Sequence, residues 1–424
     1  MASLAHLVPA CYTALVHLAA PFHPKARAWV NGRRGLWERL EAKAPQLQGC
    51  IWMHCASVGE FEQGRPVLEA LHTAHPGRPI LVTFFSPSGY EARKDLPLAT
   101  HVDYLPVDNA ANGARFVELV RPAAVLWVKY EFWPGMLGAL HAARVPTFLV
   151  SAIFRPDQPF FRWYGAAWRN MLRGLTHLFV QDEASRALLH GIDIRHVTVS
   201  GDTRFDRVRA IVEANEELPT AIAFRGGGPV LVCGSTWPAD EEQLERALAD
   251  QGRPVKCLAV PHELSEPGLA ATEARFPKPL VRWSELERTP AANVAAMLGR
   301  TEAGTLLVDR MGLLARLYRH GDVAYVGGGF GDGIHSLLEP AAWGLPVIFG
   351  PHHSKFAEAH GLIAAGGGFA VRNSAELRAL LHRLLTDPEA RRTAGEAAAR
   401  YVREQAGATA RVVASVEATL GGTR

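Results

Sequence analysis

The stretch IWMHCASVGEFEQGRPVLEALHTAHPGRPILVTFFSPSGYEARK (51–94) decides the fold class. It opens with a short apolar run at 51–54, continues through a helical stretch, and repeats the pattern from a second apolar run at 79–84. Short apolar runs separated by helices are typical of a parallel sheet that is covered by helices on both faces. The same alternation continues in the apolar runs at 123–128, 145–150, 177–180 and 196–200.

A second series of the same kind follows a break in the middle of the chain. Residues 217–228 contain a proline and three consecutive glycines, which is typical of a connection between domains. We therefore interpret 217–228 as a linker. Beyond it, the apolar runs resume at 229–235, 255–260, 305–309, 322–328, 345–350 and 367–371.

The length and the two series together predict two domains. A chain of 424 residues is longer than one hydrophobic core usually serves. We predict an α/β protein with two doubly wound, Rossmann-like domains, 25–216 and 229–424, of which the second ends in long helices over 388–420. Ligands of such sheets bind at the carboxyl ends of the strands, so two facing sheets would line one cleft.

The composition excludes several classes of function. A net charge of +3 gives no support for a nucleic-acid partner. The five cysteines are scattered without a CxxC pair, which argues against a disulfide framework or a zinc site and favours a reduced, cytoplasmic protein. The chain has no HExxH metal motif, no GxSxG nucleophile elbow and no phosphate-loop lysine. We therefore expect no metal site, and neither a serine hydrolase nor an ATPase.

Residues 1–24 form a separate apolar segment without an Asp, Glu, Lys or Arg side chain, and Lys25, Arg27, Arg33 and Arg34 follow it. A secretory signal carries its positive charge before the apolar run, not after it. Two interpretations remain open from the residues alone. The segment attaches to a membrane, with the basic residues at lipid phosphates, or it is a helix that packs on its own domain.

The loop HCASVGE (54–60) joins a predicted strand to a predicted helix and places Glu60 in the first helical turn. A carboxylate at that position favours the helix dipole, which is a structural role. It would also point towards the carboxyl end of the sheet, where a general base is needed. Both roles are compatible with the residues.

Two further loops of this kind lie in the second domain. CGSTWP (233–238) offers Ser235 and Thr236 either as helix caps or as phosphate ligands. GGGFGDGIHS (327–336) has three consecutive glycines that allow a close approach of the backbone to a ligand. Glu339 follows one turn later, either for ribose hydroxyls or to balance a helix N-terminus. A phosphate-bearing ligand fits both loops.

Six motifs in one order resemble the 3-deoxy-D-manno-octulosonic acid (Kdo) transferases of lipopolysaccharide biosynthesis. The resemblance extends over about residues 20–420 and implies the GT-B fold. It implies transfer of Kdo from CMP-Kdo to a lipid A precursor, with inversion at the anomeric carbon and without a metal or any other cofactor. The motifs are HCASVGEFEQGRPVLEAL (54–71), VDYLPVD (102–108), KYEFWPGML (129–137), SGDTRFDRV (200–208), LLVDRMGLLARLY (306–318) and GGGFGDGIHSLLEPAAWGLPVIFGPHHSKFAEA (327–359).

The resemblance also implies roles for single residues. Glu60 matches the general base, and Glu131 matches a second acidic position that supports it or binds acceptor hydroxyls. Ser57 and Gly59 belong to the same acceptor-side motif as Glu60. The implied nucleotide-sugar-binding residues are Ser235, Thr236, His262, Met311, Gly312, Gly327, Gly328, Gly329, His335, Ser336 and Glu339.

Three departures from the family pattern leave the donor contacts and the number of Kdo units open. ValProHisGlu (260–263) stands where ProArgHis is common, so that His262 is the candidate to replace an arginine. Ser336 replaces an asparagine in the glycine-rich loop, and KYEFWP replaces the more usual ThrGluLeuTrpPro.

The resemblance favours membrane attachment of residues 1–24, because the acceptor is a lipid. The expected partners are CMP-Kdo, a lipid A precursor and a membrane surface, at the cytoplasmic face of the inner membrane, with no nucleic acid. The alternatives are another GT-B transferase or an epimerase that uses a UDP-sugar, and a non-catalytic lipid or polysaccharide binder. Glu60 argues against the last alternative, since a binder has no use for a base.

Overall fold

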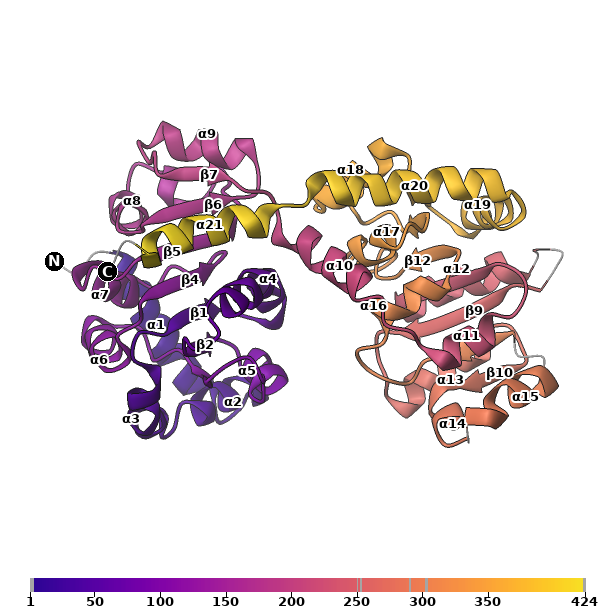
Figure 1. Cartoon of the computed structure of the whole chain (residues 1–424), viewed down its shortest axis with the longest axis horizontal. Coiled ribbons are helices and arrows are strands. Elements are labelled where there is room, and N and C mark those ends of the chain that lie inside the picture. The colour runs from indigo at the N-terminus through magenta and orange to yellow at the C-terminus, as the bar shows by residue number, and fades with distance from the viewer. Residues whose placement is uncertain (1–3, 250, 252–253, 290, 302–303, 422–424) are drawn as a thin grey trace. The chain divides into compact units, whose positions relative to one another are not determined.

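A computed structural model describes residues 4–249, 251, 254–289, 291–301 and 304–421 (Figure 1). The chain forms two compact units. Unit 1 contains Met1–Arg207 and Ala406–Arg424, and unit 2 contains Val208–Gln405.

Unit 1 is built on a parallel sheet with the order β3-β2-β1-β4-β5-β6-β7 in the described residues. Its strands are β1 (Ile51–Cys55), β2 (Ile80–Phe84), β3 (His101–Tyr104), β4 (Ala124–Val128), β5 (Thr147–Ala152), β6 (His177–Val180) and β7 (Val197–Val199). Its helices are α1 (Leu4–Ala19), α2 (Pro24–Gly32), α3 (Leu36–Leu47), α4 (Val58–Ala74), α5 (Pro87–Arg93), α6 (Ala110–Val120), α7 (Pro134–Ala142), η1 (Pro159–Phe161), α8 (Ala166–Arg173), α9 (Glu183–Gly191) and α21 (Ala408–Gly421), and α10 (Thr203–Ala214) passes into unit 2.

Unit 2 repeats the architecture, with the parallel order β10-β11-β9-β8-β12-β13-β14 among the residues described. Its strands are β8 (Val230–Thr236), β9 (Lys256–Pro261), β10 (Leu280–Arg282), β11 (Thr305–Leu307), β12 (Val323–Val326), β13 (Val347–Phe349) and β14 (Gly368–Ala370). Its helices are α11 (Pro219–Arg225), α12 (Pro238–Ala249), α13 (Glu266–Arg275), α14 (Trp283–Glu287), α15 (Ala291–Thr301), α16 (Leu314–Leu317), η2 (Tyr318–His320), α17 (Leu338–Ala342), α18 (Ala357–Ala365), α19 (Ser374–Thr386) and α20 (Pro388–Gln405).

The central strands of each sheet are buried on both faces, which explains their continuously apolar sequences. Along β1, alternate side chains enter different cores. Trp52 packs with Trp127 on one face, whereas Met53 packs with Phe61 on the other. The predicted fold class, two doubly wound α/β domains, is confirmed.

The predicted linker at 217–228 differs from the structure. Residues Pro219–Arg225 form α11, and Ala221 and Phe224 are buried in the core of unit 2. Only the glycines after α11 form a turn, in which Gly226 and Gly228 have positive φ angles. The proline that suggested a linker is the first residue of a short helix, a position that tolerates its missing N–H.

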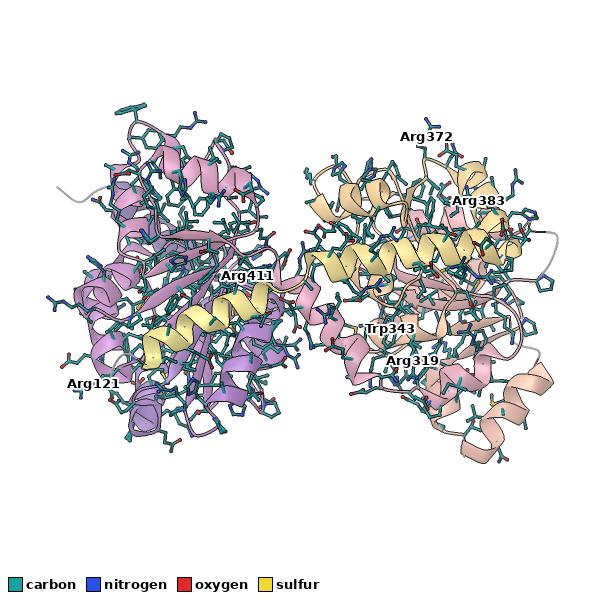
Figure 2. All side chains as sticks on the ribbon, turned by 45° about the horizontal axis from the view of Figure 1, so that its top comes forward. Arg121, Arg319, Trp343, Arg372, Arg383 and Arg411 are labelled. Carbon is teal, nitrogen blue, oxygen red and sulfur yellow. The ribbon has the colours of Figure 1, made fainter. Side chains whose placement is uncertain are left out.

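The predicted C-terminal boundary is also wrong, because the last helix belongs to unit 1. Gly407, with a φ of +108°, separates α20 from α21. Val412 of α21 is buried in the same core as Phe61. Asp206 accepts hydrogen bonds from the backbone amides of Gly407 and Thr409 at 2.6 and 2.7 Å, and caps this helix. Arg411, which Figure 2 labels on α21, donates to the Ser200 carbonyl at 2.7 Å.

The N-terminal segment forms α1, which contacts α2, α7 and α8 of unit 1. Tyr12 lies against Trp29 and Phe85, with ring centroids 6.3 and 5.7 Å away. In the part of the chain that is described, no helix combines the length and the apolar character needed to cross a bilayer. Residues 1–3 of the predicted segment 1–24, and 422–424 of the predicted second domain, lie outside the described residues.

Candidate functional site

The carboxyl ends of β1 and β4 form the switch point of the sheet in unit 1. β1 pairs with β2 on one side and with β4 on the other, so the chain progresses in opposite directions from this pair. Glu60 follows β1, and Glu131 follows β4. The two carboxylates therefore come from loops that meet where a doubly wound sheet binds its ligand.

Glu60 is held at the start of α4 by the backbone. Ser57 caps the helix, and its Oγ accepts from the Glu60 amide at 3.4 Å. The Glu60 carboxylate in turn accepts from the Ala56 amide at 2.6 Å. This arrangement resembles a capping box, with the glutamate at the third helical position. Gly59 leaves space beside it, because the nearest atom to an added Cβ would be Ser57 Oγ at 3.9 Å.

Burial makes both acids weaker than ordinary glutamates. The pKa of Glu60 is raised by burial, against the smaller opposing effects of the Ala56 amide and of Lys129. Burial, and then the negative charge of Glu60, raise the pKa of Glu131 to about 7. The negative charge of Glu60 thus disfavours ionisation of Glu131, so Glu131 is the one of the two that holds its proton more tightly. A carboxylate that is a stronger base than usual suits proton abstraction near neutral pH.

Aromatic side chains surround Glu131. Trp127 donates its indole N–H to the Glu131 carbonyl, and the Trp133 indole partly offsets the rise in the pKa of the Glu131 carboxyl. Trp133 stacks on Phe85 with centroids 4.9 Å apart. Glu131 Oε2 is buried without a hydrogen-bond partner in the described structure. A buried carboxyl oxygen without a partner needs a hydrogen-bond donor, a role that a ligand hydroxyl can fill.

The four basic residues predicted to meet lipid phosphates separate into two groups. Lys25, Arg27 and Arg34 are exposed. Arg33 is not available, because its guanidinium is inserted beneath an aromatic cluster and its burial lowers its pKa to about 9. It lies 3.9 Å from the centroid of the Trp29 ring. The interior carbonyls at the ends of β2 and β3 need a donor, and Arg33 supplies it.

Unit 2 has its own switch point, where β8 lies between β9 and β12. Ser235, with a φ of +52°, bends the chain at the end of β8. Thr236 is buried, and its hydroxyl donates to Glu241 at 3.0 Å, so the side chain is already engaged inside the domain. Ser235 is the one of the two that remains partly exposed.

The three consecutive glycines allow loops to approach one another. A Cβ on Gly327 would collide with the Ser235 carbonyl, and one on Gly329 would collide with the Gly350 backbone. Gly328 has a φ of +91° and donates its amide to Asp240 at 2.7 Å. The close backbone approach predicted at this loop is therefore made to neighbouring strand ends, which fixes the loop shape around the switch point.

Three rings lie at the same edge of the sheet. His262, after β9, stacks on Trp237, after β8, with centroids 4.4 Å apart, and on His335, after β12, with centroids 4.6 Å apart. We call Trp237, His262 and His335 the ring stack. Asp240 anchors it by accepting from the Trp237 amide at 3.0 Å.

The remaining predicted donor residues lie around this edge without a direct contact to the ring stack among the described interactions. Met311 is 81% exposed in the loop after β11, where Gly312 has a φ of +81°. Ser336 is half-buried and follows His335 directly in the sequence, and Glu339 is in the first turn of α17. Of the set, the structure brings together His262 and His335 most closely.

Sequence reasoning missed three residues that shape the two switch points. Trp237 and Asp240 determine the ring stack, and Trp133 covers Glu131. Asp240 had a local signal, since an acid at the third position of a helix accepts from the amide before the helix. The two tryptophans had none, because their partners are distant in the sequence.

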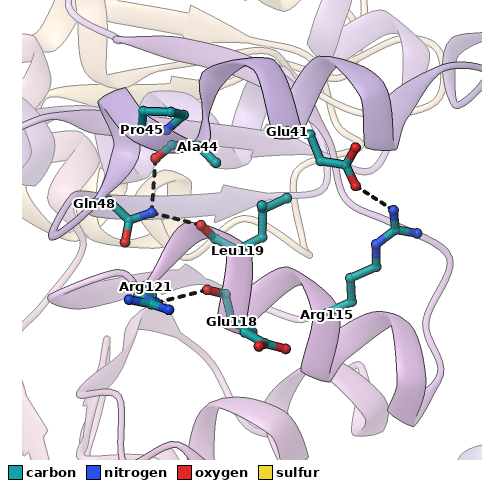
Figure 3. Close-up of a pocket in the computed structure, with 8 residues that line it drawn as sticks. All are labelled: Glu41, Ala44, Pro45, Gln48, Arg115, Glu118, Leu119 and Arg121. Carbon is teal, nitrogen blue, oxygen red and sulfur yellow. Dashed lines mark hydrogen bonds and ion pairs between the residues drawn. The ribbon is translucent and has the colours of Figure 1, made fainter.

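A cavity of about 510 Å³ lies elsewhere in unit 1, between α3 and α6 (Figure 3). Its polar groups are already satisfied by one another. Arg115 pairs with Glu41 at 2.6 Å, and the Gln48 amide donates to the Ala44 and Leu119 carbonyls. None of the residues that line it is a predicted site residue, so we assign it no function.

Comparisons with known proteins agree with this architecture. A family model described as 3-Deoxy-D-manno-octulosonic-acid transferase (kdotransferase) matches residues 31–207. The UDP-GlcNAc 2-epimerase from Neisseria meningitidis, solved with UDP-GlcNAc, is similar in structure with a TM-score of 0.61 over 87% of this chain and 99% of that chain. At 14% identity, that likeness concerns the fold alone.

Full-length relatives carry the family assignment. The 3-deoxy-D-manno-octulosonic acid transferase of Aquifex aeolicus is 29% identical, over 80% of this chain and 87% of the relative. The enzyme of the same description from Bordetella pertussis is 30% identical, over 93% of this chain and 95% of the relative. Because the match extends through both units at this identity, the chain belongs to the 3-deoxy-D-manno-octulosonic acid transferase family of glycosyltransferases.

Proposed function

We propose that this protein transfers Kdo from CMP-Kdo to a lipid A precursor in lipopolysaccharide biosynthesis, with inversion at the anomeric carbon. Glu60 is the general base, and the reaction uses no metal or other cofactor. The observation that supports the proposal best is the pair of half-buried carboxylates with raised pKa values, Glu60 and Glu131, at the switch point of unit 1. The Kdo transferases to which the chain is similar support the choice of donor.

The proposed step begins with a hydroxyl of the acceptor sugar. Glu60 removes its proton as the oxygen attacks the anomeric carbon of Kdo. The bond from that carbon to the phosphate oxygen breaks, and CMP leaves with the electron pair. Glu131, whose pKa is about 7, holds a proton during much of the cycle, and so can donate a hydrogen bond to an acceptor oxygen.

The nucleotide is assigned to unit 2. Its phosphate would meet backbone amides and Ser235 at the end of β8, and its ribose would meet Glu339 on α17. The cytosine would lie near Met311 and Gly312, and His262, His335 and Ser336 would supply further contacts. Thr236, Gly327, Gly328 and Gly329 would shape the loops that hold these side chains.

The identity of the product tests the proposal. Wild-type protein is incubated with a lipid A precursor and either CMP-Kdo or a UDP-sugar, and the lipid product is measured by mass spectrometry. We expect a Kdo-bearing product and an equal amount of CMP with the first donor only. A preference for the UDP-sugar would contradict the proposal and favour another GT-B transferase or an epimerase.

We also propose that unit 1 binds the cytoplasmic face of the inner membrane. Leu15, Leu18 and Phe22 are 64%, 73% and 88% exposed, although they are large apolar side chains. α1 contacts α8, and Trp163 before α8 is 92% exposed. Exposed apolar side chains beside the exposed cations Lys25, Arg27 and Arg34 suit the boundary of an anionic lipid leaflet.

Replacing Leu15, Leu18 and Phe22 with serine should reduce binding to vesicles that contain anionic phospholipid. We expect at least a tenfold loss, because about 0.8 kcal/mol is lost for each buried CH₂ that is removed. A matched control replaces Ile222 and Ile363, which are exposed on unit 2, with serine. If both variants bind vesicles as the wild type does, α1 is only a packed helix.

A further inference from the structure

The ring stack joins the ends of three neighbouring strands at the switch point of unit 2. Its positions are fixed by the backbone as well as by the rings. The His262 amide donates to the Thr236 carbonyl at 2.9 Å, and the His335 amide donates to the Gly327 carbonyl at 3.1 Å. Two imidazoles held this closely at a predicted nucleotide site raise the question of which one carries charge.

Hydrogen bonding decides the protonation state of His335. Trp237 Nε1 lies 2.9 Å from His335 Nε2. An indole nitrogen can only donate, so His335 Nε2 must accept and cannot carry a proton. His335 is therefore neutral with its proton on Nδ1. Burial, followed by the neighbouring His262, lowers its pKa, against an opposing effect of Asp240.

His262 is in a different position. It is exposed, and in the described structure its ring nitrogens have no hydrogen-bond or ion-pair partner. One of its faces lies on the ring of Trp237, which favours an imidazolium through a cation–π contact. A second positive charge on His335 would be repelled and would break the bond to Trp237. A single positive charge in the ring stack therefore belongs on His262, not on His335.

Two buried acids of α12, close to the ring stack, are engaged by other partners. Asp240 accepts from Tyr325 Oη, from the Gly328 amide and from the Trp237 amide. Glu241 pairs with Arg275 at 3.4 Å. Glu263, next to His262 in its loop, is exposed and has no ion pair in the described residues. Neither buried acid is therefore paired with His262, whose exposed ring is accessible to an anionic ligand.

We propose that His262 is a proton-dependent clamp for the anionic part of the donor nucleotide, with neutral His335 fixed as a hydrogen-bond donor beside it. This proposal rests on the proposed function, which places CMP at this edge of unit 2. A histidine can lose its charge, in contrast to an arginine in the same role. Donor binding should therefore be weaker at pH 8 than at pH 6.

Calorimetric titration of the full-length protein with CMP, at pH 6 and pH 8, tests the clamp. The phosphate of CMP also titrates near pH 6, so the variant His262→Arg, whose charge is permanent, provides the baseline for the ligand. Relative to that variant, we expect wild-type affinity to fall about tenfold from pH 6 to pH 8. His262→Asn should bind weakly at both pH values. Cytidine, which lacks the phosphate, should show no such difference.

His382→Arg, on the exposed face of α19, is the matched control, and it should follow the wild type. If the affinities of the wild type and of His262→Arg for CMP change equally between pH 6 and pH 8, the clamp is wrong, but the assignment of CMP to unit 2 is not contradicted. If no variant binds CMP at either pH, the proposed donor is itself contradicted. A fall in affinity for cytidine equal to that for CMP would place the pH effect on the base or ribose, and would also overturn the clamp.

Discussion

Glu131 links burial to the pH dependence of stability. A glutamate in an unfolded chain titrates near pH 4.3, whereas burial and the charge of Glu60 raise the pKa of Glu131 to about 7. Between these two values the folded protein holds a proton that the unfolded chain has released. The contribution of Glu131 to stability therefore falls as the pH rises from about 4 to 7 and is constant above that interval.

Replacing Glu131 with glutamine removes this loss. In urea unfolding, the free energy of unfolding of the variant relative to that of the wild type should rise by about 2 kcal/mol from pH 5 to pH 8. The stability of Glu118→Gln, at an exposed position on α6, should depend on pH as that of the wild type does. If the free energy of unfolding of Glu131→Gln depends on pH as that of the wild type does, Glu131 is ionised at both pH values, which would contradict the prediction.

Arg33 is a buried structural cation. It donates to the Leu105 carbonyl at 3.0 Å, the Phe85 carbonyl at 2.9 Å and the Trp29 carbonyl at 3.3 Å. Arg33→Met leaves these acceptors without a donor and should destabilise unit 1 by about 2–4 kcal/mol. Exposed Arg34→Met should change the free energy of unfolding by less than about 0.5 kcal/mol. Denaturant unfolding of both variants checks this, and equal effects would contradict the assignment.

Among the elements, α21 depends most on a contact that is remote in the sequence. Asp206 caps it across a separation of 201 residues. Asp206→Ala should cost about 1 kcal/mol and speed amide hydrogen exchange in α21, while exchange in α19 and α20 stays unchanged. Uniform faster exchange across all three helices would show that they form one cooperative unit. Glu417→Ala, within α21 itself, is the control for a change of charge alone.

At the scale of the whole molecule, some features could be predicted from the sequence and others could not. Local apolar runs indicate the alternation of strands and helices, so the fold class could be predicted. The same runs predicted the loops that contain Glu60, Ser235 and Gly327. The return of α21 to unit 1 was not, because Gly407 marks a break but not the surface beyond it. The burial of Arg33 likewise depends on carbonyls at the ends of β2 and β3. Local charge patterning had suggested a lipid contact instead.

The ring stack illustrates the same limit within the candidate site. His262 and His335 were identified singly by resemblance, yet their contact depends on the order of β9, β8 and β12 in the sheet. That order sets which loops meet, and a short motif does not contain it. The charge assignment of the two histidines follows from Trp237, whose role the sequence alone did not indicate.

The rate of Kdo transfer by Glu60→Gln tests the central claim most directly. With saturating CMP-Kdo and lipid A precursor, we expect the rate to fall by about 10²–10⁴-fold, since the base is lost, while CMP binding in unit 2 stays as in the wild type. Glu69→Gln, on the same helix, should transfer Kdo at the wild-type rate. Transfer by Glu60→Gln within a few-fold of the wild-type rate would contradict the account.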